Sequence, residues 1–279
     1  MTKLMKRFFL LVTLLFSTNN SHSSDSSKRG EALEKYEALR AETVQILLDG
    51  IELMESGNLN SAQEKFLTVH DIQFRKLGAV PIDLFIGINL NFGFVHARKS
   101  EYDQALHFYF IALAVAKQEE NWFKAIGSEQ NILVPASFDS GQETANVLTS
   151  IALAYDNSGR FSEAKKFYDE EIAIRTQRRG MTGVANVWRY ICIGAFRRND
   201  WVQLNIAGEN LFTAVDGLLG AEKLQIDGLE FIALSHVNMG NIDDAKSFFQ
   251  RAIVIDKAIN DPRISKHSET LKTLEQFKK

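Results

Sequence analysis

Apolar and small residues recur along this chain in a fixed order that is copied several times. The clearest copy has Ala233 and His236 before a central Gly240, with Ala245 and Phe249 after it. The small residues allow two helices to approach closely, and the aromatic residues fill the space between one pair and the next. The glycine marks a turn, where the first helix ends in a left-handed conformation. The pattern therefore predicts a helix, a turn and a second helix folded back on the first.

Five copies of this unit align on the residue that opens the second helix, and these anchors are Ala62, Ala105, Ala164, Leu204 and Ala245. Successive anchors are 43, 59, 40 and 41 residues apart, which indicates a period near 42 residues. Gly57 and Gly159 mark the turn in two further copies. The copy at Leu204 is the most degenerate, because Gly208 stands where the other copies have an aromatic residue. We expect the repeats at about residues 43–77, 86–119, 145–178, 185–217 and 226–258.

The 59-residue interval is longer than the period, and we place the extra residues in an insertion at 120–141. This segment contains Trp122, Phe123 and Phe138 but has no clean helical period. It either packs on the neighbouring helices or forms part of a binding face, since insertions in repeat proteins map to one face.

An apolar stripe follows the last repeat, on an otherwise Lys- and Glu-rich segment at 262–277. Its members are Ile264, Leu271, Leu274 and Phe277. A stack of helix pairs needs a terminal cap, because the last pair has an apolar face that would otherwise meet water. The stripe therefore predicts a C-terminal capping helix.

The repeated unit resembles the tetratricopeptide repeat (TPR) family, in the longer variety of about 42 residues that occurs in kinesin light chains and bacterial peptide-sensing regulators. The resemblance covers roughly residues 43 to 258. It implies an all-α fold, a right-handed TPR-type α-solenoid of helical hairpins with a C-terminal capping helix. It also implies a protein that binds another protein or a peptide. A non-repetitive helical bundle is the alternative fold.

In the TPR family, ligands bind a concave groove that is lined by the first helix of each pair. Carried over to this chain, the resemblance implies that a partner contacts Asn91, Phe94, Arg98, Asn146, Leu153, Asn157, Asn186, Arg189, Phe196 and Arg197. Asn side chains suit this role because they donate and accept hydrogen bonds.

Further first-helix positions are implied at both ends of the groove. Toward the C-terminus they are Asp227, Glu230, Leu234 and Asn238. Toward the N-terminus they are apolar, and either line the groove or pack beneath a neighbouring segment: Val44, Leu47, Ile51 and Met54. None of these groove positions is a lysine, so we do not expect the carboxylate clamp of chaperone-binding TPR proteins.

The first residues of the chain have a different character. Lys3, Lys6 and Arg7 precede an apolar run at 8–16, and a Ser-rich tract follows. This order is typical of a secretory signal peptide, here 1–23. The apolar run is too short to span a bilayer, and an uncleaved signal that acts as a membrane tether is the alternative. We therefore expect an exported protein, periplasmic or secreted, with a polar linker at 24–30 and the solenoid at 31–279.

The net charge and the positions of His and Cys residues argue against several classes of function. Removing 1–23 leaves 29 Lys and Arg against 35 Asp and Glu, a net charge of −6 that gives no reason to expect nucleic-acid binding. The six His residues show no catalytic or metal-ligand spacing. His96 and His236 stand at the aromatic position of the repeat and are expected to pack, and Cys192 stands at its small-residue position and is expected to be buried. We expect no enzyme activity, cofactor or metal.

The sequence thus predicts an exported, non-enzymatic scaffold or adaptor that binds a partner protein or peptide in its groove. Two alternatives remain. One is a secreted protein that engages proteins of another cell. The other is a peptide-sensing regulator, which would need an effector or DNA-binding module.

Overall fold

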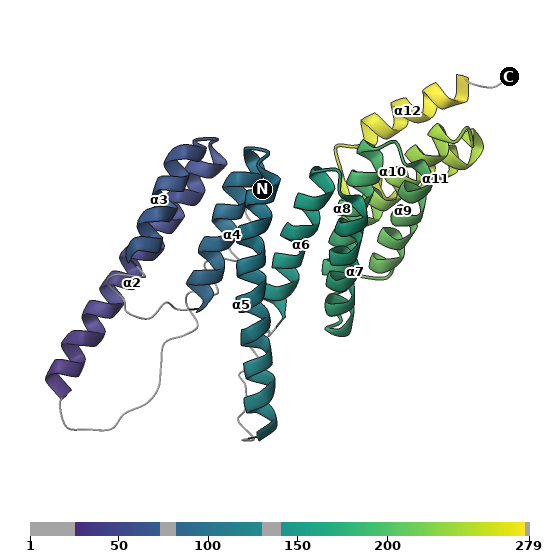
Figure 1. Ribbon diagram of the computed structural model, residues 1–279. Helices are drawn as coiled ribbons and strands as arrows, with labels where there is room; N and C mark the ends of the chain where they lie inside the picture. The colour runs from purple at the N-terminus through teal and green to yellow at the C-terminus, as the bar shows by residue number, and fades with distance from the viewer. Residues whose placement is uncertain (1–25, 73–81, 130–140, 277–279) are drawn as a thin grey trace. The chain divides into compact units, whose positions relative to one another are not determined.

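The computed structural model describes residues 26–72, 82–129 and 141–276, and within these ranges every regular element is an α-helix (Figure 1). The all-α prediction is therefore confirmed. The helices are α2 (Ser26–Glu55), α3 (Leu59–Ile72), α4 (Ile82–Arg98), α5 (Tyr102–Glu129), α6 (Gln142–Asn157), α7 (Phe161–Gln177), α8 (Met181–Arg197), α9 (Trp201–Val215), α10 (Glu222–Asn238), α11 (Ile242–Ile259) and α12 (Ile264–Gln276).

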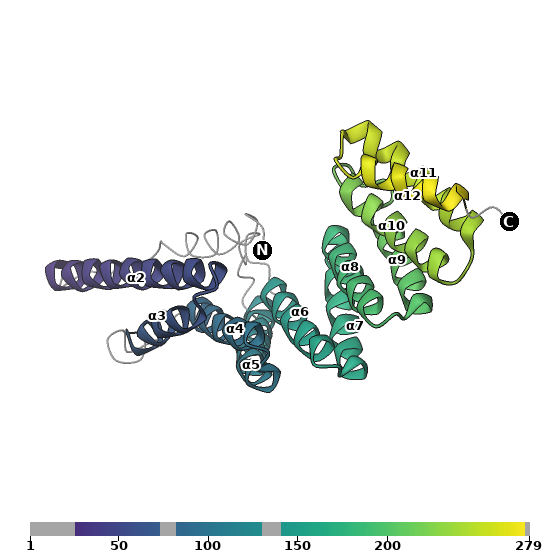
Figure 2. The same ribbon diagram turned by 90° about the horizontal axis from the view of Figure 1, so that it is seen from above.

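The chain divides into two compact units. Unit 1 is Met1–Ala154 and unit 2 is Tyr155–Lys279, so the boundary falls in the last turns of α6. In unit 1, α2 packs on α3 and α4 packs on α5; in unit 2, α8 packs on α9 and α10 on α11. Figure 2 shows α12 lying along α11 at the end of unit 2, as expected for a cap.

The turn inside each helix pair uses one residue with a positive φ angle. Gly57, Gly159 and Gly240 have φ of 89°, 82° and 82°, as the sequence predicted. Two other pairs turn at Ser100 and Asn199, with φ of 63° and 58°. The left-handed residue directs the next amide back to a carbonyl of the last helical turn, for example Asn199 turns Asp200 N–H toward the Ala195 carbonyl at 2.9 Å. Residues other than glycine are thus accepted at this position, although they adopt a positive φ angle less readily.

The core of unit 1 is built from aromatic rings packed on glycines. A Cβ on Gly50 would lie 2.5 Å from the Phe66 ring, and a Cβ on Gly93 would overlap the Tyr109 ring. Both rings are completely or almost completely buried. The apolar residues of α2 point into the same core, which includes Leu47, Ile51 and Met54. Val44 is partly buried against the same cluster. Of the two interpretations given to these four residues, packing is the one that the structure shows.

In unit 2, α9 and α10 approach each other at two glycines. A Cβ on Gly208 would lie 2.8 Å from Cγ1 of Ile232 and 3.2 Å from its backbone nitrogen. A Cβ on Gly228 would lie 3.1 Å from the backbone nitrogen of Phe212. These distances leave no room for a larger side chain. The degenerate fourth repeat therefore replaces an aromatic ring with a close contact between one helix pair and the next.

A second ring contact joins the two helices of several pairs. Tyr155 stacks on Phe167 with centroids 5.4 Å apart, and His236 stacks on Phe248 at the same distance. In unit 1, His96 stacks on Phe108, also at 5.4 Å. The prediction that both histidines are packing residues is confirmed.

Two predicted boundaries are wrong. The polar linker expected at 24–30 is helical from Ser26, because residues 31–43 are rich in Ala, Leu, Glu, Lys and Arg, which favour a helix over a linker. The insertion expected at 120–141 begins as a continuation of α5 through Glu129, since no proline interrupts that stretch. The signal segment 1–23 and Phe138 lie outside the described residues. No helix among the described residues is both long and apolar enough to span a membrane.

Candidate functional site

The predicted groove residues of unit 1 are largely occupied with internal contacts. Asn91 is 1% exposed, and its amide donates to the Gly87 carbonyl of its own helix at 2.8 Å. The prediction that Asn91 faces a groove is therefore wrong. Phe94 is half-buried and packs edge-on against Tyr109. Arg98 is exposed, but its guanidinium donates to the Met54 carbonyl at 2.8 Å. This hydrogen bond satisfies a carbonyl of the last turn of α2, which has no partner within the helix.

Asn146 and Leu153, on α6, are half-buried. The Asn146 side-chain oxygen accepts a hydrogen bond from Gln142 at 3.1 Å. Neither residue offers the open, exposed surface that the resemblance implies for a groove.

Unit 2 is different, because four of its predicted residues lie on one exposed stretch of α6 and α8. Arg197 donates to the Asn157 side-chain oxygen at 2.9 Å, and both residues are exposed. Phe196 is 44% exposed and packs edge-on against Trp201. Arg189 lies two turns earlier on α8, and its side chain is 43% exposed. Asn186 is half-buried, at the N-terminal end of the same helix.

The next residue, Arg198, holds the end of α8 in place. Its guanidinium donates to the Asp156 carboxylate at 2.5 Å and lies over the Phe161 ring at 4.1 Å. The Asp156 carboxylate occupies the space where a side chain on Gly194 would be. Burial raises the pKa of Asp156, and the Arg198 charge opposes that shift. This anchored pair presents Phe196 and Arg197 to solvent.

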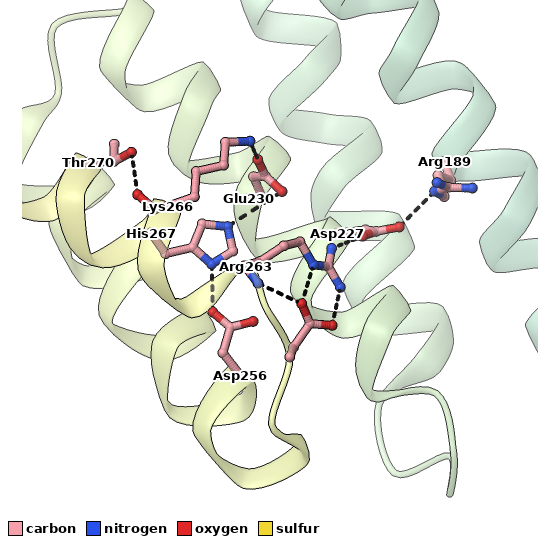
Figure 3. A network of polar contacts seen from close by, with 9 residues as sticks. Arg189, Asp227, Glu230, Asp256, Arg263, Lys266, His267 and Thr270 are labelled. Atoms are coloured by element: carbon pink, nitrogen blue, oxygen red, sulfur yellow. Dashed lines mark hydrogen bonds and ion pairs between the residues drawn. The ribbon is translucent and has the colours of Figure 1, made fainter.

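A chain of ion pairs continues from α8 across α10 to α12 (Figure 3). Arg189 Nε lies 2.7 Å from Asp227, which also pairs with Arg263. Arg263 pairs in addition with Asp261 at 3.0 Å, and this contact lowers the pKa of Asp261 to about 2. Asp227 was expected to face a ligand, but it instead joins α8 to the segment before α12.

Glu230 is engaged in the same way. It accepts from Lys266 at 2.7 Å and lies near the buried ring of His267. His267 first and then Lys266 lower the pKa of Glu230 to about 2, although partial burial opposes the shift. Arg263, Lys266 and His267 are residues that sequence analysis missed. A signal was present, because the spacing puts Lys266 and His267 on one side of α12, beside the apolar stripe, with Arg263 directly before the helix.

We call Asn157, Arg189, Phe196, Arg197, Asp227, Glu230 and Lys266 the first-helix face of unit 2. Its cations lie outermost, since the side chains of Arg189 and Lys266 are 43% and 68% exposed while Asp227 and Glu230 are 16% and 17% exposed. The face thus presents guanidinium and ammonium donors and one exposed aromatic ring. This arrangement suits recognition of an anionic or carbonyl-rich ligand.

No group of three or more His, Cys, Asp or Glu residues within the described ranges is arranged to hold a metal ion. Cys192 is buried, and burial raises the pKa of its thiol. A thiol of this kind is a poor nucleophile and acts as a small packing residue.

The sequence was compared with models of known protein families and with curated proteins. A family model of the tetratricopeptide repeat matches residues 145–175 and 227–259. No curated protein matches this sequence.

Three solved structures with similar folds are distant from this chain in sequence. BtubC (BKLC) from P. vanneervenii is 16% identical, with a TM-score of 0.62 and 94% of each chain covered. The TPR-like repeats of a putative kinesin light chain from Podosopora anserina are 12% identical, with a TM-score of 0.56, covering 81% of this chain and 97% of that one. The Rap conjugation gene regulator of the plasmid pLS20, in complex with the Phr* peptide, is 11% identical, with a TM-score of 0.55, covering 99% of this chain and 71% of that one.

Repeated helix pairs with glycine turns, two matched repeats and similar solved solenoids lead to one conclusion. This chain contains tetratricopeptide repeats at 145–175 and 227–259, and it has the fold of a TPR-type helical solenoid.

Proposed function

We propose that this chain is an exported, non-enzymatic scaffold that holds a segment of a partner protein on the first-helix face of unit 2. One observation carries the proposal. Phe196 and Arg197 stand exposed side by side at the end of α8, fixed there by the Arg198–Asp156 pair below them. Aromatic residues and arginine are enriched among the residues that dominate binding energy at protein interfaces.

The charges of this face favour a partner segment with acidic side chains. Arg189, Arg197 and Lys266 are its exposed charged groups, and the carboxylates of Asp227 and Glu230 lie recessed beneath them. An approaching carboxylate therefore meets cations first, and hydrogen bonds between charged partners are stronger than neutral ones. Such attraction between exposed groups weakens as salt is added.

A similar solenoid supports the binding of an extended or helical segment. The pLS20 Rap regulator has this type of fold and was solved with the Phr* peptide bound. The order of basic, apolar and polar residues in 1–23 supports export. The partner would then be located outside the cytoplasm as well.

The test compares binding by matched variants of the full-length protein. The full-length protein is captured, together with the proteins bound to it, from an envelope extract of the source cells. The bound partner is then identified and purified. Calorimetry then compares wild type with Phe196→Ala and Arg197→Ala, for which we expect a loss of about 2 kcal/mol or more, roughly 30-fold in Kd. The control is Lys165→Ala, because Lys165 is an exposed cation on α7 that lies outside the first-helix face.

Circular dichroism should give the same helix content and melting temperature for all variants. Raising the salt concentration should weaken binding by the wild type more than by Arg197→Ala. Unchanged affinity in both Phe196→Ala and Arg197→Ala, or a loss only in Lys165→Ala, would contradict binding on this face.

A further inference from the structure

The ring of His267 lies fully buried between two carboxylates that come from two other helices (Figure 3). Its Nδ1 atom is 2.7 Å from Oδ2 of Asp256 on α11. Its Nε2 atom is 3.5 Å from Oε2 of Glu230 on α10. His267 itself belongs to α12, so this one side chain connects the capping helix to both helices of the last repeat.

The geometry fits a protonated imidazole ring. A neutral ring has a single N–H group, so one of its nitrogens would turn a lone pair toward a carboxylate oxygen. The protonated ring has an N–H group on both sides. Its Nδ1–H donates to Asp256, and its Nε2–H faces the Glu230 carboxylate in a charge contact that is too long to count as a hydrogen bond. Asp256 is fully buried, and its Oδ1 atom has no hydrogen-bond partner. A buried carboxylate without a cation is strongly unfavourable, so the Asp256 charge requires the charge on His267.

The other charged groups near the His267 ring, on each helix or segment that packs against it, have partners of their own. On α10, Glu230 also accepts from Lys266, and Asp227 pairs with Arg189 and Arg263 instead of His267. On α11, Phe249 lies against the ring with centroids 5.8 Å apart. Before α12, Asp261 pairs with Arg263. The cations Lys266 and Arg263 are thus held by other acids, and His267 is the cation that serves Asp256.

The contact with Glu230 raises the pKa of His267 above its ordinary value, with a further contribution from Asp256, although burial opposes the shift. Both acids therefore favour the charged ring.

We propose that His267 is a proton-operated latch that docks α12 on the last repeat and releases it when the ring loses its proton. Docked α12 covers an apolar cluster, because Leu274 packs with Ala233, Ala245 and Phe249. It also places Lys266 on the first-helix face of unit 2. Release would uncover the end of the solenoid and remove one cation from that face.

The direction of the pH dependence follows from the two shifted groups. The folded pKa of His267 is raised, so its contribution is complete below the ordinary value of 6.5 and is lost as the pH rises through the raised value. The folded pKa of Glu230 is lowered from 4.5 to about 2, so its contribution is complete above 4.5 and is lost as the pH falls toward 2. Docking of α12 is therefore strongest between 4.5 and 6.5.

Hydrogen–deuterium exchange on the full-length protein tests the latch without any partner. Rates are measured from pH 5.5 to 9 and corrected for the intrinsic pH dependence of amide exchange. Above pH 6.5, opening of α12 releases one proton, so its protection should fall about tenfold per pH unit until the raised pKa is passed. The amides of α8 serve as the internal reference and should keep their protection.

Matched variants identify the residue responsible. His267→Gln should lower α12 protection at pH 6 and abolish its pH dependence. The control His236→Gln changes a histidine of α10 that stacks on Phe248, and it should keep the slope of the wild type. Glu230→Gln, at a less buried position, should keep the fold and move the loss of protection to lower pH.

Two results would overturn the proposal. One is α12 protection that stays constant from pH 6 to 9 in the wild-type protein. The other is a slope in His267→Gln that equals the slope of the wild type. Because neither result involves partner binding, each would leave the proposed scaffold function standing.

Discussion

At the scale of single residues, the size of one side chain decides what packs next to it in three of the repeats. A small residue on the first helix faces the position four residues after the anchor on the second helix. Gly50 faces the ring of Phe66, and Gly93 faces the ring of Tyr109. In the fourth repeat the ring is replaced by Gly208, and the space is used by Ile232 of the next pair. The departure from the repeat pattern at Gly208 thus lets a residue of the next helix pair fill the space that a ring fills elsewhere.

Gly208→Ala should destabilise the protein by about 1–2 kcal/mol. Alanine favours a helix over glycine by about 1 kcal/mol, but the added methyl group would press on the backbone of α10 as well as on Ile232. Chemical denaturation followed by circular dichroism measures the change.

The matched control for that substitution is Gly183→Ala on α8. A Cβ there would meet only side-chain atoms, the nearest being Cδ of Arg175 at 2.9 Å, and Arg175 is itself paired with the buried Glu171. We expect a smaller loss of unfolding free energy for Gly183→Ala than for Gly208→Ala, because only a side chain has to shift. Equal effects of the two variants would show that backbone contact at Gly208 is not limiting.

At the scale of secondary-structure elements, the last helix pair and its cap share one apolar cluster. Ala245 lies in the first turn of α11, is completely buried and packs with Ala233, Phe249 and Leu274. Three helices therefore depend on a small side chain at this position. In a linear array each pair is stabilised mainly by its neighbours, so damage at one interface spreads along the array.

Ala245→Glu should destabilise the protein by about 3 kcal/mol or more, because it buries a carboxylate that has no cation. Thermal melting of the full-length protein by circular dichroism should show helix loss at a lower temperature, beyond what α11 alone accounts for. Asp244→Ala, at an exposed neighbouring position, is the control and should melt like the wild type. A wild-type melting curve for Ala245→Glu would speak against the repeat interface described here.

At the scale of the whole molecule, two compact units of repeats follow a segment with the features of a signal peptide. The predicted groove residues of the two units have different surroundings. Asn91 in unit 1 is turned into its own helix, whereas Phe196 and Arg197 in unit 2 are exposed. We therefore propose that the partner binds unit 2.

The mature protein should begin near Ser24 and be found outside the cytoplasm. The reason is the order of a basic region, a short apolar run and small polar residues in 1–23. N-terminal sequencing of the protein from fractionated cells makes the measurement. A cytoplasmic protein that retains Met1 would refute export and leave the fold unaffected.

The sequence by itself determined the helix pairs, their glycine turns and the cap. These features depend on short-range patterns, such as Gly240 at a helix end or a small residue three positions before an aromatic one. The residues that were predicted to line a groove do lie on the first helices α4, α6 and α8. Their exposure was not correctly assigned, because an asparagine such as Asn91 satisfies its own helix as readily as it binds a ligand.

Only the tertiary structure decided which charged residues pair. Arg263 meets Asp227 and Lys266 meets Glu230 across 36 residues of sequence, and His267 meets Asp256 across 11. Helical periodicity places each of these side chains on a face of its own helix, but it contains no information about the angle at which α12 crosses α10 and α11. The physical reason is that ion pairing depends on distances between atoms of different helices, and those distances are set by the packing of the whole repeat.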